Sequence, residues 1–108
     1  MSSFGVPEQG LVLREQLPLP RPYVAPGTPT EQRLAEIWRA VLSMDCVGVE
    51  DRYIDLGGDS FLAAAILDKI EETFRFTLPM AVFAEAPTIA TLASRIDGRS
   101  PGGVNGSP

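Results

Sequence analysis

Apolar side chains recur at helical spacing in three separate stretches, and this pattern limits what the chain can fold into. Within each stretch they fall three or four residues apart, which places them on one face of an α-helix. The three faces consist of Leu34, Ile37, Trp38, Val41 and Leu42; of Leu62, Ala63, Ile66, Leu67, Ile70 and Phe74; and of Ile89, Leu92, Ala93 and Ile96. The pattern predicts an all-α bundle of three main helices that bury these faces, Trp38 included, against one another.

Start and stop signals give the expected bounds of the helices. Residues 28–31 read Thr-Pro-Thr-Glu, a capping box with proline at the first helical position, and predict a first helix over residues 29–42. The second helix is expected over residues 61–74. The last is expected over residues 87–96, with Gly98 ending it.

Two connections complete the predicted bundle. Residues 77–83 predict a short fourth helix whose Met80 and Phe83 close the end of the bundle. The loop over residues 43–59 is long for so small a domain, and such loops usually carry function. Its Cys46 is expected to be a small, partly buried residue and not a reactive thiol. Five apolar residues of the loop are expected to pack on the helices: Val47, Val49, Tyr53, Ile54 and Leu56.

The flanks differ from this region in composition. Residues 1–27 hold five of the ten prolines and predict a flexible, extended leader, with order beginning at Thr28. Residues 98–108 are rich in Gly, Ser and Pro and predict a disordered tail. The expected organisation is therefore a leader, one domain over residues 28–97, and a tail.

Charge and residue usage exclude several functions. The net charge of -5 argues against a nucleic-acid partner, and no apolar run approaches the length of a membrane span. The absence of histidine excludes the usual Ser-His-Asp and Cys-His nucleophiles and the usual zinc sites, so no catalytic residue and no metal are expected. A single cysteine and no secretory signal favour the cytoplasm, and a monomer is expected.

The candidate functional residue is Ser60, at the expected start of the second helix. Gly57 and Gly58 allow a sharp turn or a positive φ before it, and Asp59 and Ser60 are both residue types preferred at helix starts. Ser60 is therefore expected to be exposed at the positive end of a helix dipole, where an attached phosphate is favoured. The alternative is that Ser60 serves only as a cap and the glycines only as a turn.

Phe61 lies beside Ser60 and off the apolar face of its helix. A bulky aromatic on an otherwise polar face indicates a contact surface for other proteins. The alternative, held equal, is that its ring lies against the preceding loop.

Three motifs in register resemble the phosphopantetheine-dependent carrier protein family, and in particular the thiolation domains of nonribosomal peptide synthetases. Residues 56–62 read LGGDSFL, residues 78–83 read LPMAVF, and residues 86–93 read APTIATLA. The resemblance covers roughly residues 28–96 and implies an acyl-carrier-protein-like fold.

The resemblance implies that Ser60, flanked by Gly58 and Asp59, accepts 4′-phosphopantetheine from coenzyme A through a magnesium-dependent phosphopantetheinyl transferase. The thiol of that arm would carry an aminoacyl or peptidyl group as a thioester, so the protein itself would not be an enzyme. The implied partners are an adenylation enzyme and condensation, tailoring or epimerisation enzymes. Their contact surface would be formed by Phe61, Met80 and the loop over residues 43–59.

The chain departs from the family at two positions. Asp59 stands where peptidyl carriers often have histidine; aspartate there resembles carriers that work beside epimerisation domains, and also fatty-acid and polyketide carriers. Arg75 replaces a glycine that often follows the second helix. The double glycine and the lower density of acids after Ser60 favour the peptidyl type over an acyl carrier.

Two further alternatives remain, and the upstream segment adds one exclusion. An unmodified helical docking module would not need Ser60, and a serine hydrolase would need a general base that this chain lacks. Residues 10–18 faintly resemble the end of an adenylation domain, but Leu11 replaces the catalytic lysine, so no adenylating activity is expected. A chain that starts at Met1 slightly favours a free-standing carrier over an excised domain.

Overall fold

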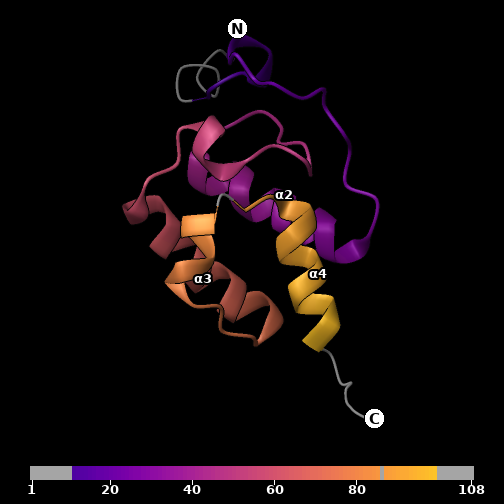
Figure 1. The fold of residues 1–108 in the computed structure, drawn as a ribbon, viewed down its shortest axis with the longest axis vertical. Coiled ribbons are helices and arrows are strands. Elements are labelled where there is room, and N and C mark those ends of the chain that lie inside the picture. Colours follow the sequence, from indigo (N-terminus) through magenta and orange to yellow (C-terminus); the bar gives the residue numbers. More distant parts are fainter. Residues whose placement is uncertain (1–10, 86, 100–108) are drawn as a thin grey trace, which may run out of the picture.

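The computed structural model describes residues 11–85 and 87–99, which form a helical bundle (Figure 1). Three α-helices make up the bundle: α2 (Pro29–Leu42), α3 (Ser60–Phe74) and α4 (Ile89–Arg99). Three 3-10 helices connect or precede them: η1 (Arg14–Gln16), η2 (Tyr53–Leu56) and η3 (Met80–Glu85). Within the described residues there is no β-strand beyond an isolated bridge, so the predicted all-α class is confirmed.

The core lies where α2 packs against both α3 and α4, and where η3 packs against α3. The predicted apolar faces point into it, and Trp38 is 0% exposed. Other wholly or nearly wholly buried core residues are Leu34, Ile66, Ile70, Ile89 and Leu92. Burial of these side chains supplies the main driving force for folding.

The capping box sets the start of α2 as predicted. The Thr28 side chain accepts a hydrogen bond from the Glu31 backbone N–H, and the Glu31 carboxylate accepts one from the Thr28 backbone N–H. The helix spans the predicted residues, Pro29–Leu42.

The predicted bounds of α4 were wrong at both ends. The helix begins two residues later than expected because Thr88 caps it, with the Thr88 hydroxyl accepting a hydrogen bond from the Thr91 backbone N–H. Gly98 was expected to end the helix, but it lies inside α4. Glycine disfavours a helix interior by only about 1 kcal/mol, which the packing of Ile89, Leu92 and neighbouring residues offsets.

The long loop packs on the bundle as predicted, except at Ile54. Val47, Val49, Tyr53 and Leu56 are buried, whereas the Ile54 side chain is 64% exposed. The loop ends in η2, and residues three apart lie on the same side of a 3-10 helix. Tyr53 and Leu56 therefore both face inward, and Ile54 faces solvent. Cys46 is partly buried, and this burial raises the pKa of its thiol, which disfavours the reactive thiolate.

The structure corrects two details of the short connection after α3. The 3-10 helix η3 starts at Met80 rather than at Thr77. Phe83 helps to close the end of the bundle as expected, with its ring centroid 4.7 Å from that of Tyr53. Met80 does not, because 44% of it is exposed.

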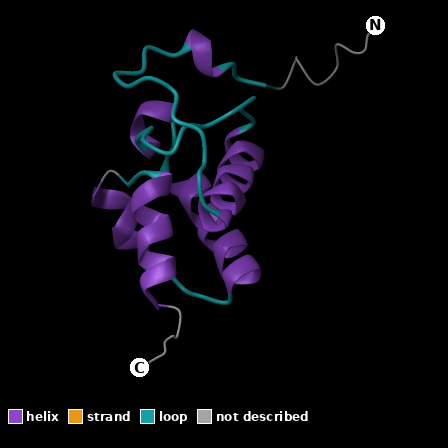
Figure 2. Ribbon diagram, turned by 90° about the vertical axis from the view of Figure 1, so that its right-hand side faces the viewer, coloured by secondary structure: helices purple, strands orange, loops and turns teal. Residues whose placement is uncertain are grey.

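The described part of the leader is not free of the bundle (Figure 2). Leu17, Leu19 and Val24 pack against the core, and the Val49 N–H donates a hydrogen bond to the Val24 carbonyl. The expectation that order begins at Thr28 was therefore wrong for residues 11–27, because three apolar side chains give this segment surface to bury. The tail was expected to begin at residue 98, but residues 98 and 99 lie in α4. The boundary at residue 27 stays a prediction, and residues 1–10 and 100–108 lie outside the described part.

Arg75 ends α3 in the left-handed conformation, with φ at 55°. Non-glycine residues adopt this conformation at a cost, whereas glycine does not. We expect Arg75→Gly to raise the free energy of unfolding by about 0.5–1 kcal/mol. Glycine removes the strain of the left-handed conformation, but its greater freedom in the unfolded chain cancels part of this gain. Urea unfolding measures the change. Arg75→Ala is the matched control, because it removes the side chain but keeps the strain, and an equal gain in both variants would contradict the explanation.

Candidate functional site

Ser60 is the first residue of α3 and is exposed. The cap of this helix is Asp59, whose Oδ1 accepts a hydrogen bond of 2.8 Å from the Leu62 N–H. The view that Ser60 itself serves only as a cap is therefore wrong. Among the described residues, no hydrogen bond engages the Ser60 hydroxyl, which leaves its oxygen available at the positive end of the helix dipole.

The two glycines before Asp59 are needed for different reasons. Gly57 adopts φ of 85°, the left-handed conformation, which was one of the two possibilities expected for the glycines of this turn. Gly58 is needed for space, because a Cβ atom there would lie 2.2 Å from Cζ of Tyr53. The backbone thus runs directly over the Tyr53 ring on its way to Ser60.

Tyr53 is the residue of this site that sequence reasoning missed. Its ring packs edge-on against Trp38 and Phe83, and its hydroxyl donates a hydrogen bond of 2.7 Å to the Asp59 carbonyl. Burial raises the pKa of Tyr53 to about 12, so the hydroxyl stays protonated at neutral pH. The sequence did show an aromatic residue shortly before the Gly-Gly turn, and it was expected to be buried. The hydrogen bond between its hydroxyl and the Asp59 carbonyl, however, became evident only from the fold.

A hollow of about 260 Å³ opens beside Ser60. Most of its wall is apolar, and it is lined by Tyr53, Ile54, Gly58, Asp59, Ser60, Ala63, Met80, Phe83 and Ala84. Two of the lining residues are exposed apolar side chains, Ile54, 64% exposed, and Met80, 44% exposed. Phe61, which follows Ser60 in the chain, is 82% exposed. The exposure of Phe61 excludes the alternative in which its ring lies against the loop.

The predicted residues thus meet at one place, where the end of the loop, the start of α3 and η3 come together. Gly58, Asp59, Ser60 and Met80 line the same hollow, and Phe61 is next to Ser60 in the chain. The site has an exposed hydroxyl but no histidine to act as its base.

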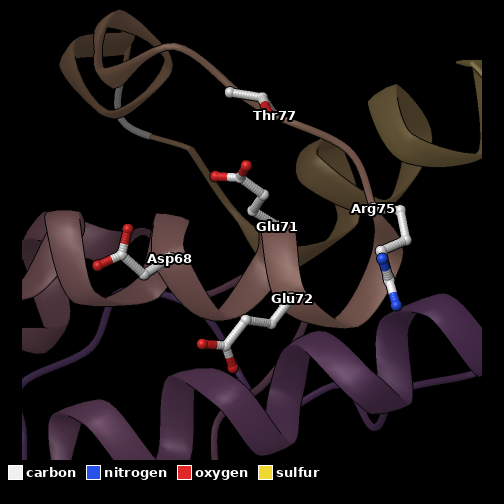
Figure 3. A pocket seen from close by; sticks show the side chains of 5 residues that line it. All are labelled: Asp68, Glu71, Glu72, Arg75 and Thr77. Atoms are coloured by element: carbon white, nitrogen blue, oxygen red, sulfur yellow. The ribbon is translucent and has the colours of Figure 1, made fainter.

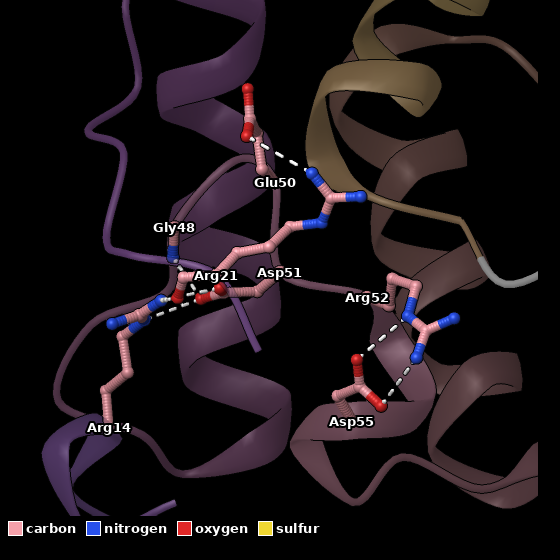
Figure 4. A network of polar contacts seen from close by, with 7 residues as sticks. All are labelled: Arg14, Arg21, Gly48, Glu50, Asp51, Arg52 and Asp55. Carbon is pink, nitrogen blue, oxygen red and sulfur yellow. Dashed lines mark hydrogen bonds and ion pairs between the residues drawn. The ribbon is translucent and has the colours of Figure 1, made fainter. Parts of the chain in front are cut away.

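A buried ion pair between Arg14 and Asp51 joins the leader to the loop over residues 43–59 (Figure 4). Nε and Nη2 of Arg14 each donate a hydrogen bond of 2.6 Å to the Asp51 carboxylate, which also accepts one from the Gly48 N–H. The hydrogen bonds with Asp51 raise the pKa of the Arg14 guanidinium. Asp51 is the only charged or polar residue buried in the core of the described chain.

A second hollow lies along the C-terminal half of α3 and the residues that follow it (Figure 3). It is lined by Asp68, Glu71, Glu72, Arg75 and Thr77. No group of three or more residues in the described part of the chain could hold a metal ion. All five residues that line the second hollow are exposed, and three of them are acidic. No described helix combines the length and apolar character needed to cross a bilayer.

Comparison with known proteins identifies the family. Residues 32–96 match the family model described as "Phosphopantetheine attachment site". The chain belongs to this family. An exposed serine with an unengaged hydroxyl at a helix start fits its prosthetic group, since a phosphate ester is favoured there. The predicted family, carrier fold and 4′-phosphopantetheine group are thus confirmed.

Relatives with similar sequences are large synthetases. Gramicidin S synthase 2 of Brevibacillus brevis is 38% identical over 96 residues, which cover 82% of this chain and 2% of that protein. Tyrocidine synthase 2 of Brevibacillus parabrevis is 37% identical over 76 residues, which cover 70% of this chain and 2% of that protein. The chain therefore spans only about 2% of the length of these relatives.

Solved structures of peptidyl carrier proteins share the fold. One similar chain comes from the complex of the phosphopantetheine transferase Sfp with coenzyme A and a peptidyl carrier protein. It has a TM-score of 0.69 and 35% identity over 71% of this chain and 100% of that one. An active-site mutant peptidyl carrier protein gives a TM-score of 0.71 and 34% identity over 75% of this chain and 90% of that one. The resemblance to peptidyl carrier domains is therefore confirmed.

Proposed function

We propose that this protein is a peptidyl carrier of nonribosomal peptide synthesis and that Ser60 is its attachment site. The observation that carries the proposal is the free, exposed hydroxyl of Ser60 at the start of α3, capped by Asp59 and preceded by Gly58. When bound, the prosthetic group supplies a thiol that holds an aminoacyl or peptidyl group as a thioester.

The attachment joins the Ser60 oxygen to the phosphorus of the phosphopantetheinyl group, while the nucleotide part of coenzyme A leaves. We propose that the serine proton goes to a base of the transferase, because this chain has no histidine to accept it. We therefore propose that the carrier has no catalytic activity of its own and that a separate transferase modifies it.

The exposed apolar side chains around Ser60 support a docking surface made of Ile54, Phe61 and Met80. Proteins expose neighbouring apolar side chains mainly where partners bind. The proposed partners are the transferase, an adenylation enzyme, and condensation, tailoring or epimerisation enzymes. We further propose that the carrier is a cytoplasmic monomer, with a leader segment before residue 28 and a tail after α4.

The test is the intact mass of the protein after incubation with coenzyme A, magnesium and a phosphopantetheinyl transferase. We expect the wild type to gain one phosphopantetheinyl group and Ser60→Ala to gain none, because alanine has no oxygen to esterify. Ser94→Ala, which alters an exposed serine inside α4, is the matched control and should be modified like the wild type.

The exposed apolar surface also favours a second candidate, a docking module that acts unmodified. A wild type that folds by circular dichroism but gains no mass would support this candidate and contradict the carrier proposal. Loading with an aminoacyl group instead of a polyketide or fatty-acyl group would then separate the peptidyl carrier from an acyl carrier.

A further inference from the structure

The Tyr53 hydroxyl contacts the peptide group that leads into Ser60. The Asp59 carbonyl accepts two hydrogen bonds, one of 2.7 Å from the Tyr53 hydroxyl and one of 2.9 Å from the Ala63 N–H. This carbonyl and the Ser60 nitrogen belong to one planar peptide group. A contact that holds the carbonyl therefore also fixes the direction in which the Ser60 backbone starts.

The side chain of Asp59 is held by a different hydrogen bond from those of its carbonyl. Its carboxylate accepts the Leu62 N–H at 2.8 Å, so the helix itself restrains the side chain of the cap. The bonds from Leu62 and Ala63 come from within the first turn and would move with α3 as a unit. The bond from Tyr53 is the one that ties this turn to the loop, six residues earlier in the chain.

Tyr53 is itself firmly placed. Its ring centroid lies 5.4 Å from that of Trp38 and 4.7 Å from that of Phe83, and Gly58 crosses its face. Only 4% of the residue is exposed, and its raised pKa keeps the hydroxyl a donor at neutral pH. A phenylalanine would fill the same space, so packing alone does not explain why the residue at this position carries a hydroxyl.

We infer that Tyr53 is a positioning residue for the modification of Ser60: its hydroxyl, bound to the Asp59 carbonyl, holds the serine in the orientation in which the transferase receives it. The inference rests on the proposed function, because it assumes that Ser60 is the attachment site. It assigns to Tyr53 no contact with coenzyme A and no transfer of a proton.

The test compares the steady-state kinetics of phosphopantetheinyl transfer to the wild type and to Tyr53→Phe. We expect kcat to fall about tenfold, because a small misplacement of a reacting group has effects of at least this size. The KM for the carrier should stay within about twofold, because uniform binding by the exposed Ile54, Phe61 and Met80 is unchanged. Tyr23→Phe, at the only other tyrosine of the sequence, is the matched control and should leave both constants unchanged.

Each outcome has a defined meaning. An unchanged kcat for Tyr53→Phe, or a change confined to KM, would overturn the inference while the carrier proposal stands. A variant that is unfolded by circular dichroism at the assay temperature would overturn it too, because the hydroxyl would then be required for folding. Failure of the wild type to be modified at Ser60 would instead contradict the proposed function on which the inference rests.

Discussion

Replacing Arg14 with alanine is expected to destabilise the protein by about 3–5 kcal/mol, the usual cost of removing one partner of a buried ion pair. The side chain of Asp51 is 1% exposed and that of Arg14 12%, and the guanidinium supplies two of the three hydrogen bonds to the carboxylate. Without it a buried negative charge keeps only the Gly48 N–H. Since small domains are stable by about 5–15 kcal/mol, the loss is a large part of the total.

Urea unfolding followed by circular dichroism measures this effect, and the chain offers a matched control. Arg52 forms a pair with Asp55 at 2.8 Å, but the side chain of Arg52 is 47% exposed. Exposed pairs contribute about 0–1 kcal/mol, so Arg52→Ala should cost much less than Arg14→Ala. Similar losses in the two variants would show that burial does not determine the strength of the Arg14–Asp51 pair.

Gly58→Ala is expected to destabilise the protein by about 2–3 kcal/mol and to slow the modification of Ser60, because a methyl group has no room there. Its Cβ would lie 2.2–2.4 Å from three atoms of the Tyr53 ring. That ring cannot easily move aside, since Trp38 and Phe83 pack against it and its hydroxyl is bound to Asp59. Either the ring or the backbone before Ser60 must shift.

Alanine substitutions at two other glycines serve as controls, because they change the backbone preference without placing a Cβ atom against another residue. The Cβ atom of Gly57→Ala would meet no atom within 4 Å, but the alanine would have to adopt the left-handed φ of this position, which costs about 1 kcal/mol. Gly98→Ala, inside α4 and in open space, should stabilise the protein by up to about 1 kcal/mol. Unfolding free energies that rank Gly58→Ala no worse than Gly57→Ala would contradict the predicted overlap with Tyr53.

Local signals in the sequence were sufficient where neighbouring residues determine the structure. The capping box of Thr28 and Glu31, the left-handed turn at Gly57 and the exposed start of α3 at Ser60 all depend on contacts within a few residues. The apolar faces of the helices were predictable for the same reason, because helical spacing places their members on one side.

Contacts between distant residues were beyond this kind of reasoning. Arg14 and Asp51 are 37 residues apart, and no local pattern indicates that one would pair with the other, so the leader was wrongly expected to be free. The outward position of Ile54 depends on the 3-10 geometry of η2, which a loop of mixed composition did not reveal. The role of Tyr53 required knowing that the chain crosses its ring at Gly58.

The position of Trp38 makes its intrinsic fluorescence a reporter of the packing around Tyr53. It is the only tryptophan of the sequence, it is fully buried, and its ring touches the tyrosine that lies beneath the Gly-Gly turn. Its indole N–H has no acceptor among the described residues, so its emission depends on the apolar side chains around it. Intrinsic fluorescence of the unlabelled protein should therefore respond to a displaced Tyr53 ring, and should stay constant for changes confined to the far end of α3.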